Sequence, residues 1–193
     1  MNHGYASRVL RTGIRRVGEN MAEVLKFTCR ECGQEHEGLP DIGFKVPWYY
    51  ETLPDKHRVD LYLDSDFCRI ENDFFIRGSL EIPITGMQRN FSYGVWMSVS
   101  EKNYRLYQAC FDSDAPTSER YVGYISNRID GYPDTLKLIG AAHVRGNGLR
   151  PLMVLQSTDH PLSIEQRQGI SFERAVEIAI PYMHEKSFPS RRA

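Results

Sequence analysis

Residues 67–82 read FCRIENDFFIRGSLEI, and this stretch decides the fold class. From 74 to 82, large apolar side chains alternate with polar or small ones, which is the period-two pattern of a β-strand. Asn72-Asp73 is a turn signal, and 67–71 reads as a partner strand in front of it. The stretch therefore predicts a β-hairpin.

The same alternation returns over 91–99, 120–127, 135–145 and 149–156, which predicts four further strands. The loops between them are short, and short loops favour antiparallel pairing because parallel strands need long crossovers. Helical spacing follows three capping residues, Ser100, His160 and Ser171. Strands in the middle with helices beside and after them predict an α+β protein: an antiparallel β-sheet with helices packed on one face.

The length of 193 residues suits one domain, and the hydrophobic fraction of 41% is that of a globular protein. Residues 1–20 are rich in Arg and poor in large apolar residues in register, which predicts a disordered basic leader. We expect one α+β domain over 21–184 and a flexible tail over 185–193.

No stretch of the sequence approaches the ~20 apolar residues that a membrane helix needs, and no apolar run of signal-peptide length follows the first arginines. We therefore expect a cytoplasmic protein with no membrane partner and with its four cysteines reduced. The net charge of −1 gives no general attraction to nucleic acid, so a protein is the expected partner.

The sharpest chemical signal is CRECG at residues 29–33, with His36 four positions after the second cysteine. Two thiolates two residues apart can grip one tetrahedral ion, and the glycine permits the tight turn between them. A structural zinc site needs four ligands, and a second Cys-x-x-Cys is missing. We predict a zinc-knuckle-like turn whose ligands are Cys29, Cys32, His36 and Cys68. A redox dithiol and two unligated thiols remain as alternatives.

Two weaker constellations accompany this turn. His160 and Glu165 stand about one helical turn apart at a loop–helix junction and are candidate catalytic residues, although helix capping also explains His160. Arg77, Glu81 and Trp96 fall on neighbouring predicted strands and are candidate ligand-binding residues. Cross-strand ion pairing and packing under a helix are the alternative explanation of these three. The common motifs of nucleotide binding, zinc proteases and serine hydrolases are absent from the sequence.

Several blocks of the chain together resemble a bacterial family of unassigned activity, domain of unknown function 2199, from about residue 27 to about residue 178. The blocks are Cys29-x-x-Cys32-Gly33-x-x-His36, Asp66-Phe67-Cys68, FFIRGSLEIP at 74–83, YGVWMSVS at 93–100, GYPDT at 131–135, LRP at 149–151 and HPL at 160–162. The resemblance implies one cytosolic bacterial domain and puts all four predicted metal ligands inside shared blocks. It implies no mechanism.

A credible metal motif without a catalytic constellation predicts a non-enzymatic bacterial binding or interaction protein with a structural zinc knuckle. One alternative is a metal-assisted hydrolase that uses His160 and Glu165 beside an open zinc position. The other is a nucleic-acid-binding accessory protein that uses the knuckle and the basic ends of the chain.

Overall fold

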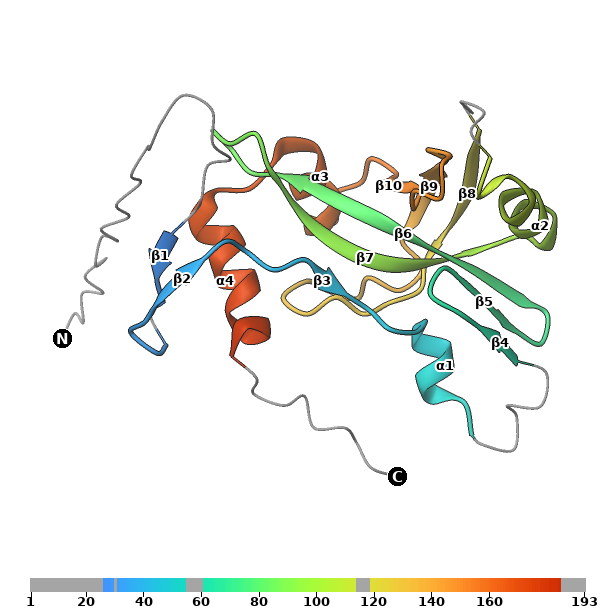
Figure 1. Cartoon of the computed structure of the whole chain (residues 1–193), viewed down its shortest axis with the longest axis horizontal. Coiled ribbons are helices and arrows are strands. Elements are labelled where there is room, and N and C mark those ends of the chain that lie inside the picture. The colour runs from blue at the N-terminus through green and yellow to red at the C-terminus, as the bar shows by residue number, and fades with distance from the viewer. Residues whose placement is uncertain (1–25, 30, 55–60, 114–118, 185–193) are drawn as a thin grey trace. The chain divides into compact units, whose positions relative to one another are not determined.

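The computed structural model describes residues 26–29, 31–54, 61–113 and 119–184 (Figure 1). The chain divides into two compact units: Met1–Pro40 with Ala179–Ala193, and Asp41–Ile178. The predicted leader, 1–20, and the predicted tail, 185–193, lie outside the described residues. One domain over 21–184 stays a prediction.

The second unit is built on a closed β-barrel. Its strands are β6 (Asp73–Pro83), β7 (Asn90–Val99), β8 (Arg120–Ile125), β9 (Ile139–His143) and β10 (Leu152–Leu155). Each pairs antiparallel with the next, and β10 then pairs parallel with β6 through Leu152 and Ser79. The α+β class and the antiparallel pairing of neighbouring strands are confirmed. The sheet is closed into a barrel, which was not predicted, because the parallel pairing of β10 with β6 joins the first and last strands.

Three short strands extend the barrel. β5 (Phe67–Ile70) pairs antiparallel with the first half of β6, which confirms the predicted hairpin, and β4 (Leu61–Leu63) pairs with β5. β3 (Ile42–Gly43) pairs parallel with β7 and leads to the short helix α1 (Trp48–Thr52). Figure 1 shows β6 and β7 as the longest strands of this unit, and most of the other strands pair with one of these two.

The predicted capping residues begin the helices. Ser100 accepts the N–H of Asn103 at 3.2 Å and starts α2 (Glu101–Cys110), which packs its Tyr104 ring 5.2 Å from that of Phe74 at the start of β6. His160 and Pro161 start α3 (Pro161–Gln168). The backbone N–H of Ile170, just after α3, donates to the carbonyl of Pro83 at 2.8 Å. α2 and α3 thus pack near opposite ends of β6.

α4 (Phe172–Met183) follows directly. Its first turn is capped by Ser171, whose hydroxyl accepts the N–H of Arg174 at 3.2 Å. Pro181 lies inside the helix, which continues to Met183. No helix among the described residues is long and apolar enough to cross a membrane.

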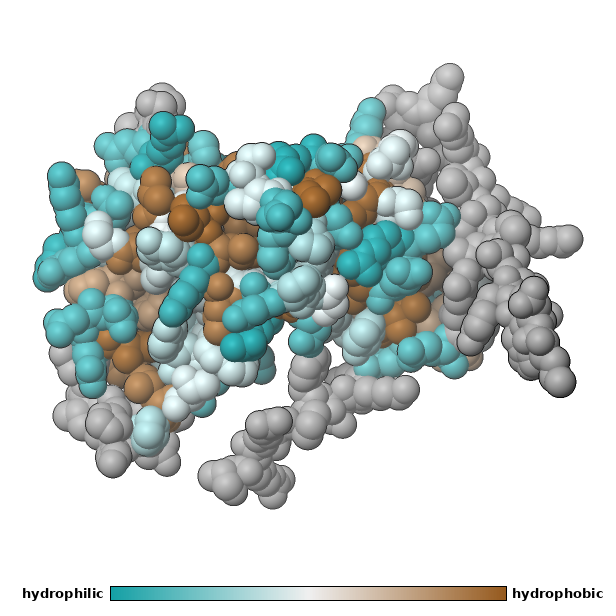
Figure 2. All heavy atoms as spheres, turned by 180° about the vertical axis from the view of Figure 1, so that it is seen from behind, coloured by the Kyte–Doolittle hydropathy of each residue, from teal (hydrophilic) through white to brown (hydrophobic). Residues whose placement is uncertain are grey.

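The barrel interior is filled by the side chains at the inward-facing positions of each strand. Leu80, Tyr93, Met97 and Met153 are completely buried there, and each large apolar side chain contributes roughly 1.5–3 kcal/mol on burial. The outward-facing positions carry both polar and apolar side chains. On β8 they include Val122, which is 61% exposed. In Figure 2, which views the structure from behind, polar side chains separate the apolar ones over the visible surface.

In the first unit, β1 (Lys26–Thr28) and β2 (Glu35–Glu37) form an antiparallel hairpin in which Phe27 faces His36. Phe27 is buried, and its ring stacks on that of His36 with centroids 5.8 Å apart. The last residues of α4, from Ala179, belong to the same unit. This unit therefore combines the predicted knuckle with the C-terminal end of a helix.

Candidate metal centre

The turn between β1 and β2 is shaped by its own backbone. The N–H of Cys29 donates to the carbonyl of Gln34 at 2.8 Å, and the N–H of Gly33 donates to the carbonyl of Cys29 at 2.9 Å. Gly33 has a φ of +71°, a left-handed conformation that glycine adopts without steric cost. The Cys-x-x-Cys-Gly spacing therefore folds as the predicted knuckle.

Four potential ligands meet at this turn. Cys29 Sγ lies 3.0 Å from His184 Nε2, and Cys32 Sγ lies 3.4 Å from His36 Nε2. The ligand atoms of these four residues all lie within 4.8 Å of one another. His36 comes from β2, and His184 directly follows α4. The group therefore joins the knuckle to a residue 155 positions from Cys29 in the sequence.

The separations suit one tetrahedral ion. With metal–sulfur bonds of about 2.3 Å and metal–nitrogen bonds of about 2.0 Å, neighbouring ligand atoms of a zinc site lie about 3.3–3.8 Å apart. The two sulfur–nitrogen distances of 3.0 and 3.4 Å and the upper limit of 4.8 Å bracket that range. Shifts of less than about 2 Å in side-chain position would complete the geometry. The group could hold a metal ion.

The Cys29 thiol is prepared for ligation. Burial raises the pKa of Cys29, but hydrogen bonds from the backbone of Cys32, the His184 ring and the backbone of Glu31 outweigh it and lower the pKa to about 7. Cys32 is exposed, and the N–H of Gln34 donates to its sulfur at 3.5 Å. A cysteine binds a metal ion as the thiolate, so the environment of Cys29 favours the form that binds.

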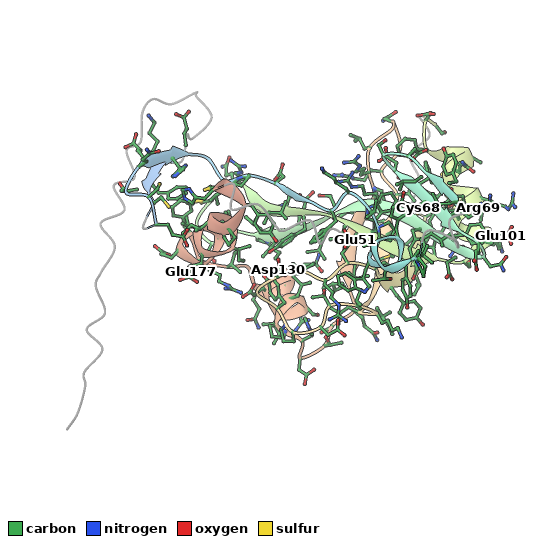
Figure 3. All side chains as sticks on the ribbon, turned by 90° about the horizontal axis from the view of Figure 1, so that it is seen from below. Glu51, Cys68, Arg69, Glu101, Asp130 and Glu177 are labelled. Atoms are coloured by element: carbon green, nitrogen blue, oxygen red, sulfur yellow. The ribbon has the colours of Figure 1, made fainter. Side chains whose placement is uncertain are left out.

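Cys68, the fourth ligand predicted from the sequence, is not in this group. It lies on β5, where Figure 3 labels it next to Arg69, and it is completely buried with Ile70, Phe75 and Trp96. Burial, and then the Asp64 carboxylate, raises the pKa of Cys68 to about 12. A thiol in apolar surroundings stays protonated, so in this structure Cys68 behaves as a small core residue.

The two catalytic candidates make structural contacts. His160 Nδ1 accepts the N–H of Leu162 at 3.2 Å, as a helix cap does. Glu165 accepts the hydroxyl of Tyr132 and pairs with Arg174 Nε at 3.2 Å. These bonds tie the loop before β9 to α3 and α4. Neither residue is part of the Cys/His group.

The three ligand-binding candidates share the outer side of β6 and β7. Arg77 and Trp96 are cross-strand neighbours, and the Arg77 guanidinium carbon lies 5.9 Å from the Trp96 ring centroid. Glu81 lies further along β6, where it accepts from Asn90 at 2.8 Å and pairs with Arg145 at 3.8 Å. The structure therefore brings Arg77 to Trp96 and gives Glu81 other partners.

His184 is the residue that sequence reasoning missed. It follows a helix at the far end of the chain and belongs to no recognisable spacing motif. Its signal was weak: it is a histidine at a helix end, and the sequence holds six histidines. Local spacing identified the first three members of the group, and tertiary contact alone identifies the fourth.

The comparisons with known proteins agree with the sequence blocks. A family model described as an uncharacterised protein conserved in bacteria, DUF2199, matches residues 28–170. The chain belongs to this family. The DUF2199 match contains Cys29, Cys32 and His36, whereas His184 lies beyond it. No curated protein and no solved structure matches the chain.

Proposed function

We propose that this DUF2199 member is a non-enzymatic, cytoplasmic binding protein in which Cys29, Cys32, His36 and His184 hold one structural zinc ion. The observation that carries the proposal is the closed set of four sulfur and nitrogen ligands. Structural zinc sites use four protein ligands, whereas catalytic zinc sites use three and leave a position for water. Zinc suits mixed thiolate and imidazole ligands in tetrahedral geometry.

The contacts of the knuckle favour metal binding over a redox dithiol. A redox pair presents its first cysteine as the exposed nucleophile. Here the first cysteine, Cys29, is 1% exposed and its sulfur contacts the His184 ring, while the second, Cys32, is the exposed one. Two imidazoles beside two thiols are a ligand set of structural zinc sites.

The metal-assisted hydrolase is supported less well. It needs His160 and Glu165 to be available for proton transfer beside an open metal position. His160 Nδ1 is used as a helix cap, and both carboxylate oxygens of Glu165 are used by Tyr132 and Arg174. His160 Nε2 is buried and has no hydrogen-bond partner among the described residues, but neither His160 nor Glu165 belongs to the Cys/His group. The nucleic-acid alternative has no support from the net charge of −1.

Elemental analysis tests the metal site. We expect the purified protein to contain about one equivalent of zinc, and we expect Cys29→Ser to lose nearly all of it because a serine hydroxyl is a poor zinc ligand. Cys110→Ser is the matched control, since Cys110 lies on α2 and outside the Cys/His group. A full zinc equivalent in Cys29→Ser, or no zinc in any preparation, would refute the site.

Cobalt substitution tests whether the site is closed. Cobalt(II) bound by two thiolates and two imidazoles should give the intense visible bands of a tetrahedral complex together with thiolate charge-transfer bands. A closed structural site should keep this spectrum when azide or cyanide is added, because no coordination position is open. A spectrum that shifts on titration with either anion would reveal an open position and favour the metal-assisted hydrolase.

A further inference from the structure

Arg77 is held in an unusual setting on the outer side of β6. Its guanidinium group lies against the backbone of two glycines on neighbouring strands: a Cβ atom would come within 2.9 Å of Arg77 Nη2 at Gly43 and within 3.5 Å of it at Gly94. The Trp96 ring lies on the same side of the strand pair. The planar guanidinium thus packs directly on the backbone of β3 and β7, because the glycines there have no side chains.

Most donors of this guanidinium are unused. Arg77 Nη1 donates to the carbonyl of Ser65 at 3.4 Å, which is a long hydrogen bond. Arg77 Nε is buried and has no hydrogen-bond partner among the described residues, and none of them accepts from Nη2. A guanidinium offers five N–H donors, and in folded proteins buried donors are normally paired.

Arg150 brings a second cation to the same place. Its Nη2 donates to the same Ser65 carbonyl at 3.2 Å, and its Nε pairs with Asp66 at 2.6 Å. Burial, and then the Arg150 charge, lowers the pKa of Arg77, while Asp66 opposes this change. Asp66 is already engaged by Arg150, so within the described part of the chain Arg77 has no ion-pair partner of its own.

The backbone of Arg150 is also held in place by a hydrogen bond. Arg145 Nε donates to the carbonyl of Arg150 at 2.6 Å, and Arg145 pairs with Glu81 on β6. The loop that carries Arg150 is therefore tied to the strand that carries Arg77. The two guanidinium groups thus share the carbonyl oxygen of Ser65. One carboxylate, that of Asp66, lies beside them and pairs with Arg150, so a local excess of positive charge remains.

We propose that Arg77 and Arg150 form a binding site for an oxyanion, the carboxylate or phosphate group of a small ligand, on the outer side of β6. Guanidinium groups bind such groups through two parallel N–H donors, and the free donors of Arg77 can make this contact. The glycine backbones and Trp96 hold the group flat before the ligand arrives. All residues of the site belong to the barrel unit, so the site does not depend on the metal.

Calorimetric titration of the full-length, metal-loaded protein tests the site, with inorganic phosphate and succinate as separate probes at constant ionic strength. We expect saturable binding of at least one probe, and amide NMR shifts on binding at Ser65, Asp66 and Arg77. Arg77→Ala should weaken this binding at least about tenfold, because it removes a charged donor to the anion. Phosphate alone, succinate alone or both would each support the site and identify the group that it prefers.

One variant in the site and one outside it separate binding from stability. Gly43→Ala keeps every charge but puts a methyl group 2.9 Å from Arg77 Nη2, so it should displace the guanidinium and weaken binding. Val122→Ala changes an exposed side chain on β8, outside the site, and should bind as the wild type does. If Arg77→Ala fails to fold, Gly43→Ala decides. The proposal would be overturned if neither probe binds saturably, or if neither Arg77→Ala nor Gly43→Ala weakens the binding. Arg77 would then only stabilise the turn at Ser65.

Discussion

Replacing His184 with alanine is expected to remove most of the zinc from the purified protein and to weaken zinc affinity by more than about 100-fold. Loss of a hydrogen-bond partner of a ligand costs about 10–100-fold in metal affinity, and loss of a ligand itself costs more. His184 Nε2 lies 3.0 Å from Cys29 Sγ, so its removal leaves Cys29, Cys32 and His36 with an open fourth position. Competition with a chromophoric chelator measures the affinity.

Two variants control this experiment. His143→Ala removes a histidine on β9, outside the Cys/His group, and should keep about one equivalent of zinc. His184→Cys should restore binding, because three thiolates and one imidazole are also a structural zinc set. Full zinc content in His184→Ala would show that His184 is not a ligand, even if Cys29→Ser loses the metal.

The strands of the barrel could be predicted because their signal is local. The alternation over 67–82 and 91–99 corresponds to β5, β6 and β7, with no bound shifted by more than one residue. Each strand has an inward apolar side, so its period appears in the sequence whatever the strand's partners are. The capping residues Ser100 and His160 were visible for the same reason.

Barrel closure could not be predicted from this pattern. Closure depends on the pairing of Leu152 with Ser79, and an open sheet would show the same alternation in every strand. The sequence did contain a trace of it: Gly78, Gly123 and Gly140 occupy inward positions where an open sheet would place large side chains. Glycine inside a strand marks a close approach of other atoms.

The residues of the Cys/His group divide in the same way. Cys29, Cys32 and His36 lie within one turn and its hairpin, so their spacing carried the signal. Cys68 is the predicted fourth ligand because it lies on the first strand of the predicted hairpin, but its neighbours Phe75 and Trp96 make it part of the core. His184 joins the group from the end of a distant helix, so it forms no local spacing motif with the other three residues.

The second large effect is expected from Gly123→Ala, which should destabilise the barrel by about 3 kcal/mol or more. A Cβ atom at Gly123 would lie 2.1 Å from the carbonyl oxygen of Ser98 and 2.7 Å from Met97 Cγ. The oxygen belongs to the backbone of β7, the strand that pairs with β8, so it cannot turn away as a flexible side chain can. Overpacking of this kind costs ~1–3 kcal/mol and more where the backbone must shift.

Urea unfolding followed by circular dichroism measures this effect, with Gly94→Ala as the matched control. Gly94 is also a strand glycine, but its added Cβ makes ordinary contacts at 3.5 Å, so stability should change by less than about 0.5 kcal/mol. Met97→Ala in the Gly123→Ala background should recover little stability, because the shorter clash is with the Ser98 backbone. If Gly123→Ala unfolds at the same urea concentration as Gly94→Ala, β7 and β8 do not pack as closely as a closed five-stranded barrel requires.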